Sequence, residues 1–244
     1  MIGRGHRVIL LTAAVTPDPR LTGVLVDPRT RSAQYKRAIM AWQEAAAKVS
    51  AELVVVETSG ASPDDILDTL DGTTWISFSP SDRGVLRGKG AAEAEALDHA
   101  IGMLGARIVG TSTLHKATGR LILGNPGAVL GDVCPTEFRV RRSLDRSYCD
   151  TRLISCSLDG WATYLTGMAT EVDDQGGRYL EHVLAQRLIM AEYGGGASVS
   201  RFRVRPSIRG VSGQTGQSYG GQWRARAVAP LERMLAHVAS RKEL

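Results

Sequence analysis

The stretch LVVVETSG at residues 53–60 decides the fold class of this chain. Its first four residues form a continuous aliphatic run, which is typical of a strand buried on both faces of a parallel sheet. Polar residues and a glycine follow directly, as they do where a strand ends in a loop. Ligands of open α/β sheets bind beyond the carboxyl ends of the strands, so Glu57, Ser59 and Gly60 are candidate binding residues.

Strands and helices alternate on both sides of this stretch. Within 31–50, for example, Tyr35, Ile39 and Trp42 recur at helical spacing. The alternation predicts a parallel sheet that is covered by helices, with right-handed crossover connections. In the first half of the chain we expect strands at 7–14, 53–56, 74–78 and 106–110, and helices at 31–50, 63–70 and 90–104. Ala13, near the end of the first strand, joins the candidate binding residues.

The second half of the chain is less regular. The sequence contains no internal repeat and no low-complexity linker, which favours one domain over 1–244. We divide it into a regular half (1–125), an irregular half (126–222) and a basic amphipathic helix (223–244). In the second half we expect strands at 121–123, 138–140, 153–156 and 202–204, and helices at 160–166 and 179–192.

The composition excludes several classes of protein. With 244 residues, of which 43% are hydrophobic, the chain can bury one large α/β core. No apolar run is long enough to span a bilayer, and the run after residues 1–7 is too short for a signal peptide. Three cysteines without metal-type spacing provide neither a zinc site nor a disulfide framework. We therefore expect a cytoplasmic protein.

The net charge of +5 points to anionic ligands. Lys and Arg are spread along the chain, and aromatic residues make up only 5% of it. Aromatic side chains are too few to stack nucleotide bases, so nucleic acid is not an expected partner. Small phosphate-bearing molecules such as nucleotide diphosphates are favoured, and a solvated basic surface is the simpler alternative.

A first cationic cluster, RGKG at residues 87–90, stands before the helix predicted at 90–104. Gly88 and its neighbouring glycine let the backbone approach a ligand, and Arg87 and Lys89 can neutralise phosphate beside the first amides of the helix. The glycine spacing differs from that of a P-loop. An exposed basic turn is the alternative.

A second cluster, KATGR at residues 116–120, follows the fourth predicted strand. Lys116, Thr118 and Arg120 could stabilise a leaving phosphate by charge and hydrogen bonds, a role that a divalent metal often fills. No acidic pair stands at this point of the sequence, so we expect no metal here. A strand-to-strand turn with exposed cations is the alternative.

A third polar stretch, RGVSGQTGQSYGG at residues 209–221, alternates glycines with hydroxyl side chains. Such a loop can close over phosphates, which makes Ser212 and Thr215 candidate ligands. Glycine- and serine-rich composition is equally typical of a flexible surface loop.

A fourth stretch, VDDQGGRYLEHV at residues 172–183, places an acidic turn before a helix. Asp174 can cap that helix, and Glu181 or His182 can serve as a general base at its start. The two side chains point about 100° apart on a helix, so we expect only one to face a substrate. The alternatives are a surface pairing of Glu181 with Arg178 and a buried histidine.

In this order, the motifs resemble a group of small bacterial glycosyltransferase-like proteins that are encoded with genes for capsule, lipopolysaccharide and other surface glycans. The resemblance spans nearly the whole chain, up to Tyr219. The matching residues are Asp27, Pro28, Arg31, Tyr35, Glu57, Ser59, Gly60, residues 87–90, Glu93, Glu95, Lys116, Thr118, Gly119, Arg120, residues 150–152, Tyr179, residues 181–183, Ser212, Gly213, Thr215, Gly216 and Tyr219.

The resemblance implies the GT-A architecture, an α/β/α sandwich around a mostly parallel nucleotide-binding sheet, with an irregular acceptor half. It implies transfer of a sugar from a nucleotide-sugar donor to a hydroxyl of a glycan, a lipid-linked acceptor or a protein. With the cationic clusters, it favours an inverting reaction without metal or other cofactor.

The expected catalytic residues are Glu181 and His182. The expected nucleotide and phosphate ligands are Ala13, Glu57, Ser59, Gly60, Arg87, Gly88, Lys89, Lys116, Thr118, Arg120, Ser212 and Thr215. Asp150, Arg152 and Tyr179 are expected on the acceptor side.

Two other functions stay open on the sequence. A nucleotidyltransferase that acts on a sugar phosphate would use similar cationic loops, although it normally needs carboxylates for magnesium. A non-catalytic binding protein could retain the same fold. The helix at 223–244 could contact the inner face of a membrane or a second copy of the chain, or simply pack on the core.

Overall fold

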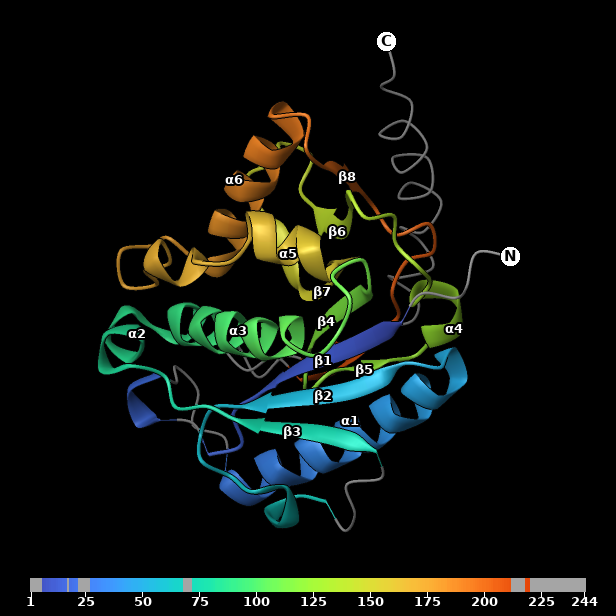
Figure 1. The fold of residues 1–244 in the computed structure, drawn as a ribbon. Helices are drawn as coiled ribbons and strands as arrows, with labels where there is room; N and C mark the ends of the chain where they lie inside the picture. Colours follow the sequence, from blue (N-terminus) through green and yellow to red (C-terminus); the bar gives the residue numbers. More distant parts are fainter. Residues whose placement is uncertain (1–5, 17, 22–26, 68–71, 212–217, 220–244) are drawn as a thin grey trace.

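A seven-stranded sheet forms the centre of the molecule, with the strand order β3-β2-β1-β4-β7-β6-β8 (Figure 1). The computed structural model describes residues 6–16, 18–21, 27–67, 72–211 and 218–219. The strands of this sheet are β1 (Arg7–Ala13), β2 (Glu52–Glu57), β3 (Thr73–Ser77), β4 (Thr113–Thr118), β6 (Glu137–Arg142), β7 (Cys149–Ser157) and β8 (Ser198–Ser200).

The sheet is parallel in its first half and mixed in its second. Strands β1 to β4 all run in the same direction, so their carboxyl ends meet at one edge. Strand β7 pairs antiparallel with both β4 and β6, and β8 pairs parallel with β6. The predicted α/β class with a mostly parallel sheet is therefore confirmed.

Two long helices cover opposite faces of the parallel strands (Figure 1). Helix α1 (Pro28–Val49) begins after Asp27, whose carboxylate accepts a hydrogen bond from the Thr30 amide at 2.8 Å. Its buried face includes Trp42, which packs into one core with β1 and β2. Helix α3 (Lys89–Gly105) buries an alanine-rich face against the other side of the sheet. The layers are thus helix, sheet and helix.

The second half of the chain adds to the α3 side of the sheet. Helices α5 (Leu158–Tyr164) and α6 (Leu180–Tyr193) share a core with α3, in which Trp161 and Val183 are completely buried. Strands β10, β9 and β5 form a separate small sheet. The remaining elements are α2 (Asp82–Arg87), α4 (Pro126–Val129), β5 (Ile122–Leu123), β9 (Ile208–Val211), β10 (Ser218–Tyr219) and the 3-10 turns η1 (Pro19–Leu21), η2 (Pro63–Asp65) and η3 (Met168–Thr170).

Two of the predicted strands are wrong. Residues 106–110 form the turns after α3, and the fourth parallel strand is β4 instead. Strand β4 is hard to recognise in the sequence because it contains two polar residues, His115 and Lys116. Both are fully buried, and each makes a hydrogen bond to a side-chain or backbone partner. Residues 202–204 are also irregular: Phe202 packs into the core beside α1, and the strand on the edge of the sheet is β8.

Other predictions are shifted or untested. The helix expected at 63–70 is represented by η2 within the described residues. The helix expected at 223–244 lies outside them. In the described ranges, each helix is either too short or too polar to cross a bilayer.

The contact between α3 and the turn before η3 should make stability depend on pH. Both carboxylate oxygens of Asp98 accept the Gly167 amide, at 3.1 and 3.0 Å. Burial raises the pKa of Asp98 to about 6, although the Gly167 amide and Arg187 partly lower it. An unfolded aspartate has a pKa of about 3.9. Between roughly pH 4 and 6 the native state therefore binds more protons than the unfolded state, and stability falls as pH rises through this window.

We predict that Asp98→Asn raises the free energy of unfolding at pH 7.5 by about 1 kcal/mol, after allowance for solvent screening. The gain should shrink towards pH 4, because Asp98 is then protonated in the native state. Urea unfolding at several pH values measures it. The control is Asp64→Asn, which changes an exposed carboxylate. A gain that does not vary with pH would contradict this account of Asp98.

Candidate active site

Glu57 holds together the loops that follow β1 and β2. It is completely buried at the end of β2. Its Oε1 accepts hydrogen bonds from the Val15 amide at 3.1 Å and from the Ser59 hydroxyl. Its Oε2 accepts the amides of Ser59 at 2.9 Å and of Ala61 at 3.0 Å. The carboxylate therefore shapes the carboxyl edge of the sheet, and its oxygens are already engaged by protein donors.

The other predicted residues of these loops lie at the same edge. The methyl group of Ala13 is in the core, and its carbonyl accepts the Thr58 amide and hydroxyl, both at 3.0 Å. Gly60 adopts a φ of +81°, a conformation that favours glycine. Thr118 ends β4, and the next residue, Gly119, donates its amide to the Thr12 carbonyl at 2.9 Å.

Lys116 lies inside the sheet and not on an exposed turn. Its side chain has 0% exposure, and its Nζ donates to Glu93 Oε1 at 2.8 Å and to the Thr151 carbonyl at 2.7 Å. Glu93 Oε1 also accepts the Thr12 hydroxyl at 2.9 Å. Burial disfavours a charge on Glu93, but Lys116 and Lys89 outweigh it and lower the pKa of Glu93 to about 2. Glu93 is therefore ionised.

Two buried arginines approach this edge from the α1 side. Arg31 is 4% exposed and donates its Nε to the Ala14 carbonyl at 2.7 Å. Arg120 is 6% exposed, and its guanidinium lies over the Tyr35 ring at 5.9 Å from the centroid. Nη1 of Arg120 is buried and has no hydrogen-bond partner among the described residues. A buried donor without a partner is costly, so this atom points to a missing acceptor.

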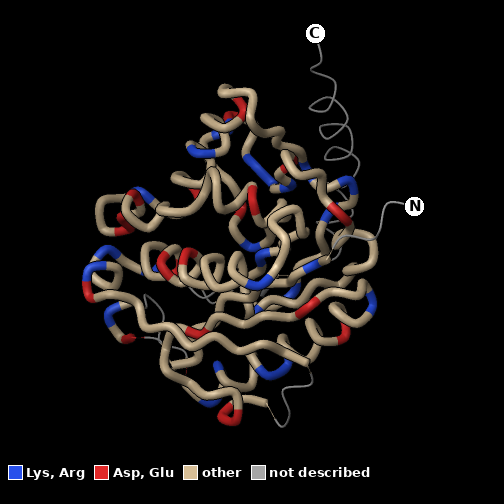
Figure 2. The backbone as a smooth tube through the Cα atoms, in the orientation of Figure 1, with Lys and Arg blue, Asp and Glu red and all other residues tan. Residues whose placement is uncertain are grey.

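Lys89, in the first turn of α3, completes the cationic group. Burial lowers its pKa, and the positive charges of Arg120, Arg31 and Lys116 lower it further, whereas Glu93 opposes them. Four cations therefore gather at the carboxyl ends of β1 and β4, and the carboxylates of Glu93, Glu57 and Asp174 interact with members of this group. Elsewhere in the described chain, basic and acidic residues are interleaved (Figure 2).

The glycines at 88 and 90 make room for the loop before α6. Asp174 Oδ2 accepts the Gly90 amide at 2.6 Å, and the Asp174 amide donates to the Arg87 carbonyl at 2.8 Å. A Cβ atom on Gly88 would lie 2.6 Å from the Asp174 Cβ, and Gly88 has a φ of +115°. Asp174 thus caps α3 and not α6, whose N-cap is Tyr179. Burial raises the pKa of Asp174, and Glu181 and Glu93 add to this, whereas the Gly90 amide lowers it.

Arg87 connects two segments. Its guanidinium donates to the carbonyls of Ala169 and Thr170, at 2.9 and 2.7 Å. These bonds tie α2 to η3, so part of the hydrogen-bonding capacity that we assigned to phosphate holds the backbone.

Glu181 faces the cationic group from the first turn of α6. Its Oε1 accepts the Thr151 hydroxyl at 2.9 Å, and the Thr151 carbonyl in turn binds Lys116. The pairing of Glu181 with Arg178 is absent from the described contacts, since Arg178 bonds to Glu171 and Gln186.

His182 is exposed between two tyrosines. Its ring centroid lies 6.0 Å from that of Tyr148 and 5.5 Å from that of Tyr179. Burial raises the pKa of Tyr148 to about 12, and the charges of Glu181 and Asp150 contribute to this shift. Tyr148 is therefore a neutral phenol at physiological pH, beside the carboxylate of Glu181.

Asp150 and Arg152 form an ion pair on β7, in which Arg152 Nε donates to Asp150 Oδ1 at 2.8 Å. The Arg152 guanidinium also lies 4.7 Å from the centroid of the Tyr219 ring. The three residues predicted on the acceptor side, Asp150, Arg152 and Tyr179, therefore lie around the start of α6 together with Glu181 and His182.

The structure thus places the predicted residues in two groups, one at the carboxyl ends of the parallel strands and one around the start of α6. Lys116 and Thr151 connect the two groups through their hydrogen bonds. Ser212 and Thr215 lie outside the described residues. Six further residues belong to the site. Arg31, Tyr35, Glu93 and Thr151 matched the family pattern without an assigned role, Asp174 was expected to cap the next helix, and sequence reasoning missed Tyr148. Arg31 and Tyr35 carried a signal, since their spacing places both on one face at the start of α1.

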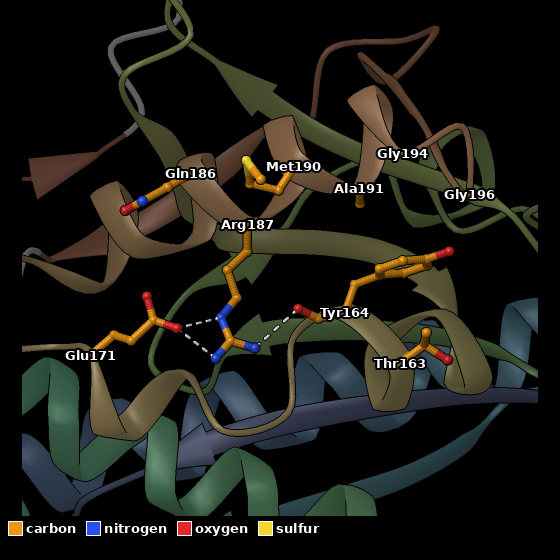
Figure 3. Close-up of a pocket in the computed structure, with 9 residues that line it drawn as sticks. All are labelled: Thr163, Tyr164, Glu171, Gln186, Arg187, Met190, Ala191, Gly194 and Gly196. Atoms are coloured by element: carbon orange, nitrogen blue, oxygen red, sulfur yellow. Dashed lines mark hydrogen bonds and ion pairs between the residues drawn. The ribbon is translucent and has the colours of Figure 1, made fainter.

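A separate pocket of about 380 Å³ lies between α5, α6 and the turn after α6 (Figure 3). Arg187 spans it, and its guanidinium donates to Glu171 and to the Tyr164 carbonyl. None of the predicted site residues lines it. The lining residues are Thr163, Tyr164, Glu171, Gln186, Arg187, Met190, Ala191, Gly194 and Gly196.

Solved structures show what this architecture is similar to. A galactosyltransferase, LgtC, in complex with donor and acceptor sugar analogues, superimposes with a TM-score of 0.52 at 12% identity, over 81% of this chain and 74% of that one. An active-site mutant of LgtC gives 0.50 at the same identity and coverage. The fold is GT-A-like. A putative nucleotide-diphospho-sugar transferase from Desulfovibrio desulfuricans gives 0.48 at 11% identity, over 80% of this chain and 79% of that one.

No protein-family model and no curated protein matches the chain. At 11–12% identity, the structural likeness establishes the fold and leaves the reaction to be argued from the site.

Within the described ranges, no group of three or more His, Cys, Asp or Glu side chains is arranged to hold a metal ion. The carboxylates nearest the cationic group are engaged, Glu93 by Lys116 and Asp174 by the Gly90 amide. Hard divalent cations need several oxygen ligands, and this edge presents mainly nitrogen donors.

We predict that Gly88→Ala destabilises the protein by about 2–4 kcal/mol, because the added Cβ meets Asp174 and the backbone has a positive φ. The control is Gly102→Ala in the middle of α3, where nothing lies within 4 Å of the added atom. That change should stabilise by about 0.5–1 kcal/mol through helix propensity. Thermal and urea unfolding measure both. Equal effects of the two substitutions would show that the contact with Asp174 is unimportant.

Proposed function

We propose that the protein transfers a sugar from a nucleotide-sugar donor to a hydroxyl acceptor, without a metal ion. One observation carries the proposal: the buried Arg120 guanidinium, whose charge acts on Lys89 together with that of Arg31, has an unpartnered Nη1 among the described residues. A buried guanidinium donor without an acceptor favours an anion, and the carboxyl edge of a parallel sheet is where α/β folds bind nucleotides. The GT-A-like fold is consistent with this class of donor.

The donor half of the site would neutralise the leaving diphosphate. Arg120 can give a charged, directional hydrogen bond to a phosphate oxygen, and Lys89 and Arg31 add charge in a dry environment. Lys116 would not contact the diphosphate directly, because its Nζ is already bound to Glu93 and to the Thr151 carbonyl. The loops that Glu57 holds, with Ser59 and Gly60, would enclose the nucleoside. Arg87 supports this half through its bonds to η3.

The acceptor half would activate the incoming hydroxyl. In this reaction Glu181 removes the hydroxyl proton as the acceptor oxygen attacks the anomeric carbon. The bond from that carbon to the diphosphate breaks as the new bond forms, so the configuration inverts. His182, Tyr179 and the Asp150–Arg152 pair line the path of the acceptor, which can belong to a glycan, a lipid-linked molecule or a protein. A cytoplasmic enzyme of surface-glycan synthesis fits this proposal.

The two alternatives are less well supported. A nucleotidyltransferase normally uses carboxylates that hold magnesium, and Glu93 and Asp174 are both committed to protein partners. A non-catalytic binding protein has no need to keep a carboxylate beside its cations. Here Glu181 is connected to Lys116 through one residue, Thr151.

We predict that nucleotide-sugars bind in the presence of EDTA and that Arg120→Met weakens binding about 10–100-fold, the effect of losing a charged hydrogen bond. Isothermal titration with a panel of uridine, guanosine and cytidine diphosphate sugars measures the affinities. The matched control is Arg29→Met, which removes an exposed cation two residues before Arg31. Binding that appears only when manganese is added would refute the metal-free site.

We predict that Glu181→Gln lowers kcat about 10²–10⁴-fold and leaves donor affinity unchanged, since only the proton transfer is lost. Turnover of the donor that binds best, followed by release of the nucleoside diphosphate, measures the effect. Glu44→Gln on the exposed side of α1 is the control. Full activity of Glu181→Gln would remove Glu181 as the base and direct attention to Asp174.

A further inference from the structure

We propose that Thr151 is a positioning residue, which orients Glu181 and connects it to the cationic side of the site. The catalytic part of this inference rests on the proposed function. Thr151 lies on β7 with 8% exposure, so its side chain is shielded from competing water. Its hydroxyl donates to Glu181 Oε1 at 2.9 Å, and its carbonyl accepts Lys116 Nζ at 2.7 Å. One residue thus holds both a candidate base and a buried cation.

An irregularity of the sheet allows this double role. Strand β6 pairs with β7 through Val140 and Ile154, and then through Arg142 and Cys149, so the register shifts between these pairs. Thr151 lies within the shifted segment, beyond the last residue of β7 that pairs with β4. Its carbonyl is therefore turned away from the regular ladder and towards Lys116. Irregularities of this kind often re-aim side chains beside active sites.

The hydroxyl of Thr151 restrains Glu181 in a way that no other described contact does. Among the described residues, Thr151 is the one that donates a hydrogen bond to the Glu181 carboxylate. The hydrogen bond uses Oε1 and leaves Oε2 as the oxygen that receives a proton. Threonine is suited to the task because its branched side chain has a restricted χ1. A carboxylate that is held by one oxygen keeps its second oxygen in a fixed direction.

The orientation of the Glu181 carboxylate should affect turnover and not donor binding. Proton transfer depends on the alignment of the base with the acceptor hydroxyl, and small misplacements cost large factors in rate. We expect Thr151→Val, which removes the hydroxyl and keeps the shape, to lower kcat at least about 10-fold with an unchanged donor affinity. Thr151→Ser retains the donor and should restore most of the rate.

A double-mutant cycle distinguishes this role from a loss of stability. In the Glu181→Gln background, Thr151→Val should have no further effect on turnover, since residues that act as one unit are not additive. The matched control is Thr113→Val on β4, a buried threonine whose hydroxyl accepts the Val133 amide at 3.2 Å. Thr113→Val should lower the stability by a similar amount and should leave kcat unchanged. Additive effects of Thr151→Val and Glu181→Gln would overturn the positioning role.

Crystal structures of the full-length Thr151→Val and Thr113→Val proteins test the orientation without any substrate. We expect the Glu181 carboxylate to move or to occupy several orientations in Thr151→Val and to keep its place in Thr113→Val. An unmoved Glu181 in Thr151→Val overturns the inference, whatever the activity. If the wild type turns over no nucleotide-sugar, the proposed function fails, and the position of Glu181 still decides the role of Thr151.

Discussion

The buried ion pair between Lys116 and Glu93 is the interaction on which the rest of the site depends. A lone ammonium group inside the sheet would be destabilised by several kcal/mol, so the ionised Glu93 is a condition of the fold. Because Lys116 also binds the Thr151 carbonyl, and Glu93 the Thr12 hydroxyl, the pair joins β1, β4, β7 and α3. It does so where the sheet changes from parallel to antiparallel, which is where the proposed donor and acceptor sides meet.

A second constraint fixes the distance between these two sides. The loop before α6 approaches the junction of α2 and α3 so closely that only glycine fits at position 88. Asp174 then takes the Gly90 amide, and Arg87 holds the carbonyls of η3. The second half of the chain is therefore locked onto the first, and not attached as an independent domain. For a displacement reaction this matters, because the base and the leaving group must lie on opposite sides of one carbon atom.

The sequence predicted the strands and helices in which apolar residues recur with a regular period. The prediction failed where polar residues are buried. The aliphatic run at 53–56 and the helical spacing of α1 were sufficient to predict the parallel half of the sheet. Strand β4 was missed because Lys116 looks exposed in sequence, and only Glu93, 23 residues away, makes its burial possible. The cluster at 87–90 was recognised, but Arg87, Gly88 and Gly90 hold the neighbouring loops in place. Thr151 gave no signal of its role, since its contacts depend on the register shift in β7.

In the proposed metal-free site, the fixed cations would act differently from a bound metal ion. Burial is the main cause of the lowered pKa of Lys89, and repulsion by Arg120, Arg31 and Lys116 adds to it, whereas Glu93 opposes both. A bound diphosphate would relieve this repulsion. Part of its binding free energy would therefore come from the electrostatic repulsion between the cations of the free protein. As the bond to the sugar breaks, charge on the leaving phosphate grows, and the cations stabilise it without having to move. In the proposed reaction, Lys89, Arg31 and Arg120 would thus supply the charge that a bound cation would otherwise bring.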